Sequence, residues 1–339
     1  MIKVAINGFG TIGRRVAYAV SQQKDMEISG VVKVNPDYVA KVAAKDFKIY
    51  TPDGESRKRF KDAGIETIGI SKELFMNSDV VVDATPEGLG KRNKEIYEDL
   101  RKKAIFQGGE EAGLTDSSFN SYASYNQCMG KSYLRVVSCN TTGLTRSLYP
   151  IYKEIGAEFV MSTLIRRGTD PNDNKKGPMN AIEPSFSFPS HQSLDVKTII
   201  SDLNIESVAV KVPTTLMHVH VVHVDLKRDS SEEEIINLWN RYRRIKLLSK
   251  KDGFLSTAQI MDLPRELGRN RSDLYELVIL KDSVKVQGKK LNYIQAVHQE
   301  SIVVPENVDA IRAITGICNQ EDSLNLTDQN LGIKSENLI

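Results

Sequence analysis

The chain has 339 residues, of which 40% are hydrophobic and 27% charged, and its formal net charge is +2. This composition is typical of a globular protein long enough for two domains, and the small net charge argues against a nucleic-acid or membrane-surface partner. The apolar runs are too short to span a bilayer, no signal-peptide pattern opens the chain, and three cysteines fit a reducing cytoplasm.

The first half of the chain alternates short apolar runs with amphipathic stretches. The pattern predicts strands at 2–7, 28–34, 79–84, 104–107 and 134–138, and helices at 12–23, 36–47, 88–102 and 115–124. Strands that alternate with helices form parallel sheets through right-handed crossovers. We therefore expect an α/β domain with a Rossmann-type, doubly wound parallel sheet.

The second half carries longer strands and few helix signals. Strands are predicted at 157–168, 205–213, 216–227, 275–281 and 291–298, which indicates an α+β domain with a mixed or antiparallel sheet and one helix-covered face. A polar segment at 169–193 is long for a connection, so we expect it to be functional. We place a first domain at 1–138, completed by a C-terminal helix within 303–339, and a second at 139–302.

Three glycines form a G-x-G-x-x-G pattern at the first strand–helix junction. Gly8 allows a tight turn, Gly10 lets the backbone approach a pyrophosphate, and Gly13 brings the helix against the strand. The pattern predicts that residues 1–138 bind NAD or NADP. The alternative is a glycine-rich turn without a ligand, whereas a phosphate-loop NTPase is excluded because no GK[ST] follows.

The second predicted strand bears on the choice of cofactor. Enzymes that use NAD place an acidic residue near its end, but here Lys33 and Asn35 stand in that region. A lysine can pair with a 2′-phosphate, so we expect NADP to bind at least as well as NAD. Alternatively, Lys33 is only a solvated surface residue.

Cys139 lies where an apolar strand ends and a helical pattern begins. The start of a helix lowers the pKa of a thiol, which favours a nucleophile, while a small buried residue is the alternative. Cys128 and Cys318 fit the second description. From the local sequence alone, both interpretations of Cys139 stay open.

A histidine-rich strand offers a base for this thiol. His218 and His220 share one face of the strand and His223 faces the other way. A zinc site is an alternative, but no further ligand at suitable spacing completes it, and we expect no metal. A nicotinamide cofactor with an activated cysteine indicates aldehyde oxidation through a thiohemiacetal and a thioester.

Six segments in order, NGFGTIGRRV, IFQGGEEAG, VVSCNTTGL, IRRGTDPND, VPTTLMHVH and AVHQESIVVPENVDAIRA, resemble the archaeal-type (class II) phosphorylating glyceraldehyde-3-phosphate dehydrogenases over essentially the whole chain. The resemblance implies oxidation of D-glyceraldehyde 3-phosphate with inorganic phosphate to 1,3-bisphosphoglycerate, in glycolysis or gluconeogenesis. It also implies NADP or NAD as cofactor and a cytoplasmic homotetramer.

The resemblance assigns roles to single residues. The nucleophile falls on Cys139, and the catalytic histidine on His218, with His220 as the second choice. The expected cofactor contacts are Gly8, Gly10, Thr11, Ile12, Gly13, Lys33, Gly109, Arg167 and Gln299. The expected substrate and phosphate contacts are Ser138, Asn140, Thr141, Arg167, His191 and Gln192. Further basic residues available for anion binding are Arg166, Lys175, Lys176 and Lys211.

One position departs from the family pattern, and two rival functions remain. The family often has SHH where this chain has SHQ, and Gln192 can bind phosphate by hydrogen bonds but carries no charge. An enzyme like aspartate-semialdehyde dehydrogenase is one rival, although CNTT lacks the glutamine expected after its cysteine. The other rival is a catalytically inactive dinucleotide-binding module.

Overall fold

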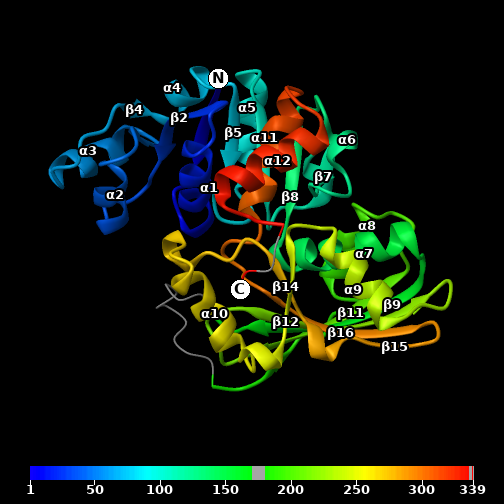
Figure 1. Ribbon diagram of the computed structural model, residues 1–339. Helices are drawn as coiled ribbons and strands as arrows, with labels where there is room; N and C mark the ends of the chain where they lie inside the picture. Colours follow the sequence, from blue (N-terminus) through cyan, green and yellow to red (C-terminus); the bar gives the residue numbers. More distant parts are fainter. Residues whose placement is uncertain (170–179, 336–337, 339) are drawn as a thin grey trace. The chain divides into compact units, whose positions relative to one another are not determined.

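The computed structural model describes residues 1–169, 180–335 and 338, so the predicted anion-binding residues Lys175 and Lys176 lie outside the described part. The chain divides into two units (Figure 1). The first comprises Met1–Val137 and Val304–Leu331, and the second comprises Ser138–Val303 and Gly332–Ile339.

The first unit is built on an eight-stranded parallel sheet with the order β4-β3-β2-β1-β5-β6-β8-β7. Its strands are β1 (Ile2–Asn7), β2 (Met26–Val32), β3 (Ile49–Thr51), β4 (Gly69–Ile70), β5 (Val80–Asp83), β6 (Lys103–Gly108), β7 (Ser117–Phe119) and β8 (Tyr133–Val137). The strand order changes direction at β1, which pairs with β2 on one side and β5 on the other. This confirms the predicted doubly wound sheet.

Helices cover both faces of this sheet (Figure 1). They are α1 (Thr11–Ser21), α2 (Tyr38–Ala43), α3 (Gly54–Asp62), α4 (Ser71–Met76), α5 (Gly90–Asp99), α6 (Tyr125–Cys128), α11 (Val304–Thr315) and α12 (Gln320–Leu331). Leu74 and Phe75 of α4 and Tyr97 of α5 pack in one core cluster with Val81 and Phe106 of the sheet. Helix α11 packs against α1 and α6.

Two predictions for the first unit need correction. The segment 115–124 is not a helix, because Ser117–Phe119 pairs with β8 and the Asn120 side chain accepts the amides of Tyr122 and Ala123 in a local turn. The C-terminal region forms two helices in place of one, and Gly316, with φ of +70°, ends the first of them.

Buried polar side chains attach α11 and α12 to the rest of the first unit. The Arg312 guanidinium is fully buried and donates to both carboxylate oxygens of Asp25 at 2.8 Å. Asp309 accepts hydrogen bonds from Ser121, Ser323 and Thr327. Charge-assisted bonds in a buried setting are strong, so the C-terminal helices are an integral layer of this unit.

The second unit contains a mixed sheet with the order β10-β11-β9-β12-β16-β14-β13, with β15 paired to β16. Its strands are β9 (Ala157–Arg167), β10 (Glu183–Pro184), β11 (Ile205–Val212), β12 (His218–Leu226), β13 (Ile245–Leu248), β14 (Leu277–Leu280), β15 (Lys285–Gln287) and β16 (Lys290–Val297). Its helices are α7 (Cys139–Glu154), α8 (His191–Lys197), α9 (Glu232–Asn240) and α10 (Thr257–Glu266). The predicted mixed sheet is confirmed.

Helix α7 is the central helix of the second unit and is buried along most of its length. Arg146 donates to the carbonyls of Tyr275 and Ile302, at 2.6 and 2.9 Å. The Trp239 indole, the only one in the chain, donates to the carbonyl of Ser147 at 3.0 Å. These bonds fix α7 to helix α9 and to the segments that precede β14 and α11.

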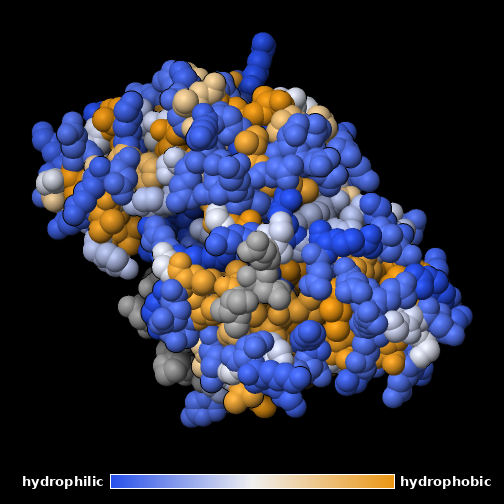
Figure 2. Space-filling model, in the orientation of Figure 1, coloured by the Kyte–Doolittle hydropathy of each residue, from blue (hydrophilic) through white to orange (hydrophobic). Residues whose placement is uncertain are grey.

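Helix α10 packs on the β14 end of the other face, where its Ile260 and Leu263 lie in one core cluster with Val278 and Ala296. No other described helix covers this face. Its strands present partly exposed apolar side chains there, and they are Phe159, Met161, Ile165, Val208, Val210, Val219, Val221 and Ile294. The segment at 180–194 adds exposed apolar side chains, with Phe186 95% and Ile182 68% exposed. Figure 2 also shows hydrophobic side chains (orange) at the surface of the second unit.

Among the described residues, no helix has both the length and the apolar character needed to cross a membrane.

The turn between β1 and α1 depends on a close backbone approach. A Cβ placed on Gly13 would lie 1.9 Å from the carbonyl oxygen of Gly8, whereas no described atom lies within 4 Å of one placed on Gly10. Of Gly10 and Gly13, only Gly13 is therefore required by the packing of the protein itself.

We expect the two alanine substitutions to differ in stability. Gly13→Ala forces helix and strand apart and is expected to cost at least about 2 kcal/mol of unfolding free energy. Gly10→Ala is expected to cost less than about 1 kcal/mol, since only helix capping changes. Denaturant unfolding followed by circular dichroism measures both, with Trp239 fluorescence reporting the second unit separately. Equal losses would contradict the packing role of Gly13.

Candidate active site

The predicted nucleophile is the first residue of α7. Ser138 caps this helix, and its hydroxyl accepts the amide of Thr141 and lies 2.9 Å from the Thr141 hydroxyl. Cys139 is partly exposed, whereas Asn140 and Thr141 are buried. The thiol therefore stands at the positive end of a 16-residue helix dipole.

Close packing brings this helix end to the sheet. A Cβ on Gly143 would lie 2.5 Å from Val297 Cγ2 of β16 and 3.6 Å from the ring of His220. With no side chain at Gly143, the first turn of α7 reaches the inner face of β12 and β16. As a result, Asn140 Oδ1 lies 2.9 Å from His220 Nε2.

The two candidate histidines share the inner face of β12, as predicted from their spacing. His218 and His220 are both buried, whereas His223 is exposed. His218 Nδ1 accepts the backbone N–H of Arg167 at 3.1 Å. His220 has partners at both ring nitrogens, because Gln295 Nε2 lies 2.9 Å from Nδ1.

Burial sets the protonation of these histidines. Burial together with the charge of Arg166 lowers the pKa of His220 to about 3. Burial, with nearby His220, Arg167 and Arg166, holds the pKa of His218 well below its usual range. Both rings are therefore neutral at neutral pH.

Arg166 is the basic group beside the thiol. It lies on β9 directly before Arg167, and successive strand residues point to opposite faces. Burial lowers the pKa of Arg166, and the nearby Cys139 partly offsets this effect. Leu164 pairs with His220 across β9 and β12, so Arg166, two residues farther along β9, lies on the inner face with that histidine.

The remaining predicted substrate residues begin α8. Ser190 precedes the helix, and His191 is exposed while Gln192 is only 1% exposed. Neither amide atom of Gln192 has a hydrogen-bond partner among the described residues. A buried amide without partners is costly, and a bound ligand would satisfy it. Lys211, in contrast, pairs with Glu183 at 2.6 Å.

Gln299, which the sequence predicts as a cofactor contact, forms hydrogen bonds to the backbone before β12. Its Oε1 accepts the amide of Met217 at 2.8 Å and its Nε2 donates to the carbonyl of Thr215 at 3.0 Å. Met217 adopts a φ of +67° directly before His218. Gln299 thus holds the strained turn that leads into the histidine strand.

The other predicted cofactor residues lie in the first unit. Gly8, Gly10, Thr11, Ile12 and Gly13 form the β1–α1 turn, and among the described side chains none caps the first turn of α1. The free amides of an uncapped helix start are suited to a phosphate. Lys33 follows β2 and forms an ion pair with Asp37 at 2.8 Å.

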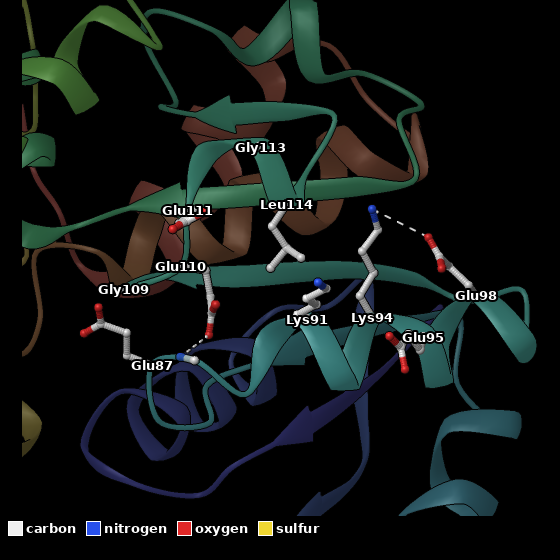
Figure 3. A pocket seen from close by; sticks show the side chains of 11 residues that line it. Glu87, Lys91, Lys94, Glu95, Glu98, Gly109, Glu110, Glu111, Gly113 and Leu114 are labelled. Carbon is white, nitrogen blue, oxygen red and sulfur yellow. Dashed lines mark hydrogen bonds and ion pairs between the residues drawn. The ribbon is translucent and has the colours of Figure 1, made fainter.

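Gly109 lines a pocket between α5 and the loop after β6 (Figure 3). Glu110 Oε1 accepts the amides of Gly88 and Gly90, both at 3.0 Å, and so fastens this loop to the start of α5. The pocket has a volume of about 640 Å³ and is lined by five glutamates and two lysines. This excess of carboxylates does not favour the pyrophosphate of a dinucleotide there.

No group of three or more histidine, cysteine, aspartate or glutamate side chains with metal-binding geometry occurs within residues 1–169, 180–335 and 338.

The buried neutral histidines predict a pH dependence of stability. An unfolded histidine binds a proton below about pH 6.5, whereas His220 stays neutral down to about pH 3. Because the unfolded state then binds more protons, the unfolding free energy falls with falling pH, by about 1.4 kcal/mol per pH unit for each such histidine. Between pH 6 and 4, His220→Gln is expected to reduce this slope.

Denaturant titrations followed by Trp239 fluorescence measure the slope in the second unit. His223→Gln is the matched control, because His223 lies exposed on the same strand. An unchanged slope in His220→Gln would show that His220 is not buried as a neutral ring.

Comparison with known proteins agrees with this architecture. Residues 138–267 match the family model for the C-terminal domain of glyceraldehyde 3-phosphate dehydrogenase, and residues 2–107 match the one for the N-terminus of dihydrodipicolinate reductase. The chain is 55% identical to a glyceraldehyde-3-phosphate dehydrogenase of Thermoplasma volcanium over 334 residues, which cover 98% of this chain and 99% of the relative.

Two further relatives with the same name come from Picrophilus torridus and Thermococcus kodakarensis. They are 56% and 50% identical over 333 residues, which are 98% of this chain and 97% and 99% of the relatives. Identity at this level over nearly the full length of both partners establishes common descent and a common fold. The chain belongs to the glyceraldehyde-3-phosphate dehydrogenase family.

Proposed function

We propose that this protein oxidises D-glyceraldehyde 3-phosphate and transfers the acyl group to inorganic phosphate, which yields 1,3-bisphosphoglycerate. The observation that carries the proposal is the position of Cys139 at the start of the buried helix α7, electrostatically coupled to Arg166. Family membership supports the same activity, since the relatives carry the name of that enzyme.

Two sources of positive charge favour the thiolate, which is the reactive form of Cys139. The dipole of α7 and the Arg166 guanidinium both stabilise negative charge on sulfur. The thiolate is the nucleophile that an aldehyde requires. Cys139 Sγ attacks the aldehyde carbon, a carbon–sulfur bond forms, and the carbonyl electrons move to the oxygen.

His218 is the group we assign to that oxygen. A backbone N–H can only donate, so the bond from Arg167 makes Nδ1 an acceptor, and the neutral ring carries its proton on Nε2. His218 Nε2–H therefore donates to the developing oxyanion instead of taking the proton of the thiol. This role differs from the base expected from the sequence. We do not assign the base to His220, because both its nitrogens are hydrogen-bonded.

The substrate and the attacking phosphate both need anion sites near the thiol. Arg166 supplies a partly buried positive charge, and Gln192 supplies a buried amide without a partner among the described residues. Thr141 and His191 are the neighbouring candidates. We assign Arg166 the main charge in this site, with Arg167 contributing through its backbone.

The β1–α1 turn has the features that a nicotinamide dinucleotide needs. The uncapped start of α1, with the open space at Gly10, would hold the pyrophosphate beside Thr11 and Ile12. When bound, the cofactor supplies an acceptor for the hydride that leaves the substrate carbon. The resulting thioester on Cys139 is attacked by a phosphate oxygen, and the thiolate leaves.

We also infer that the protein assembles as a homotetramer, as the resemblance implies. The partly exposed apolar side chains on the β9, β11 and β12 part of this face, together with the exposed Ile182, Phe186 and Phe188, support binding of a second copy. Apolar surface of this kind is rarely left open to water. Light scattering of the purified protein measures the mass of the assembly directly.

The activity is tested with glyceraldehyde 3-phosphate, NADP or NAD, and inorganic phosphate. Formation of the reduced cofactor is expected to require phosphate, with arsenate as a substitute. Cys139→Ser is expected to lower kcat by at least about 10³-fold, because the alcohol is a far weaker nucleophile. Cys318→Ser, at a partly buried cysteine of the first unit, is the control and should retain activity.

Other outcomes distinguish the rival functions. Turnover of aspartate semialdehyde in preference to glyceraldehyde 3-phosphate would favour the related dehydrogenase. Cofactor binding without any turnover would favour an inactive module. Turnover without phosphate would remove the phosphorylating step from the proposal.

The Lys33–Asp37 pair predicts how cofactor preference is tuned. We propose that Lys33 pairs with the 2′-phosphate of NADP, in competition with Asp37, whose other oxygen caps α2 through the amide of Ala40. Asp37→Asn keeps that cap and removes the competing charge, so KM for NADP is expected to fall by about threefold or more. Lys33→Met is expected to raise it.

Steady-state kinetics with both cofactors measure the effect, and KM for NAD is the internal control because NAD lacks the phosphate. Equal changes for NADP and NAD in either variant would refute the pairing.

A further inference from the structure

A hydrogen-bonded chain of three side chains leads from the sheet to the residue next to the nucleophile. Gln295 of β16 and His220 of β12 are directly opposite each other in the antiparallel ladder, and their side chains lie 2.9 Å apart. His220 continues to Asn140 of α7, also at 2.9 Å. Gln295 and His220 are fully buried and Asn140 is 3% exposed.

The donors and acceptors in this chain can be assigned one after another. Gln295 presents its amide nitrogen, which can only donate, so His220 Nδ1 accepts. A neutral imidazole then has its single proton on Nε2, which donates to Asn140 Oδ1. The oxygen of the Asn140 amide is thereby committed to His220, and the nitrogen becomes the end that can donate elsewhere.

The charged surroundings favour a neutral ring. Arg166 of β9 is the charged group near His220, and His218 is the titratable neighbour on the same strand. From β16 and α7, Gln295 and Asn140 face the ring without charge. A second proton on His220 would place two cations side by side in a buried site.

We propose that His220, with its tautomer set by Gln295, is a positioning residue that fixes the rotation of the Asn140 amide, so that its nitrogen serves as a hydrogen-bond donor to the substrate oxygen beside Cys139. The proposal rests on the proposed function and deepens it. It assigns a role to His220, the second histidine of the segment His218-Val219-His220. It also assigns a role to Gln295, a residue that no pattern in the sequence singled out.

The proton position on His220 is tested without any turnover. In ¹⁵N NMR spectra of the full-length protein, His220 is expected to show a protonated Nε2 and an unprotonated Nδ1 at neutral pH. Loss of these signals in His220→Gln assigns them. A proton on Nδ1, or on both nitrogens, would overturn the proposal whatever the activity of the enzyme.

A substitution at Gln295 tests the effect on catalysis. Gln295→Glu replaces the donor to Nδ1 by an acceptor, so the neutral ring moves its proton to Nδ1 and stops donating to Asn140. We expect kcat to fall at least tenfold at neutral pH, with KM for glyceraldehyde 3-phosphate changed less than threefold. A second proton on His220 restores the donor, so the ratio of this kcat to that of the wild type should rise as pH falls.

Gln295→Met is the matched control, because it removes the hydrogen bond without adding an acceptor. Its kcat relative to the wild type is expected not to change with pH. A constant ratio in Gln295→Glu as well would overturn the proposal, since a purely structural role predicts the same loss at every pH. Failure of the wild-type enzyme to turn over would instead count against the proposed function, and the NMR result would still decide the state of His220.

Discussion

The chemistry of the second unit depends on how closely the first turn of α7 approaches the sheet. Gly143 permits this approach, since a side chain there would collide with Val297. Farther along the helix, Arg146 and Ser147 are bonded to three other segments of the unit. The position of Cys139 is therefore set by a rigid, buried helix and not by a loop, which is the kind of support that a nucleophile needs.

The electrostatics of the site follow from the same approach. The helix dipole and Arg166 make this end of α7 positive, and burial keeps His218 and His220 neutral. Such a site would favour the three anions of the proposed reaction, which are the thiolate, the oxyanion of the substrate and the phosphate. Neutral histidines can donate hydrogen bonds there without the cost of a further buried cation.

Much of this arrangement was predictable from local sequence patterns. The buried strands of the first sheet are continuous apolar runs, and alternation along β12 correctly put His218 and His220 on one face. The short strands β3 and β4, at one end of the first sheet, escaped prediction because runs of three and two residues carry no periodicity. The start of α7 at Cys139 followed from the change of pattern at that point.

Long-range pairing lies beyond such patterns. Gln295 is 75 residues from His220 in sequence, and only the register of β16 on β12 makes them neighbours. Whether Arg166 or Arg167 supplies the positive charge near the thiol likewise depends on which of these two adjacent side chains faces α7. Lys33 was identified from its place after β2, but its partner Asp37 became evident only from the geometry of the α2 cap.

The attachment of α11 and α12 to the first unit has a consequence for biosynthesis. A ribosome completes the sheet strands of that unit early and then adds all of Ser138–Val303 before the helices that hold Arg312 and Asp309 emerge. At about 5–20 residues per second, this interval is on the order of ten seconds. During that time helices α11 and α12 are not yet packed on the nascent sheet, and Asp25 has not yet formed its ion pair with Arg312. The first unit to be synthesised is thus the last to be finished, and the second unit can fold while the first is still incomplete.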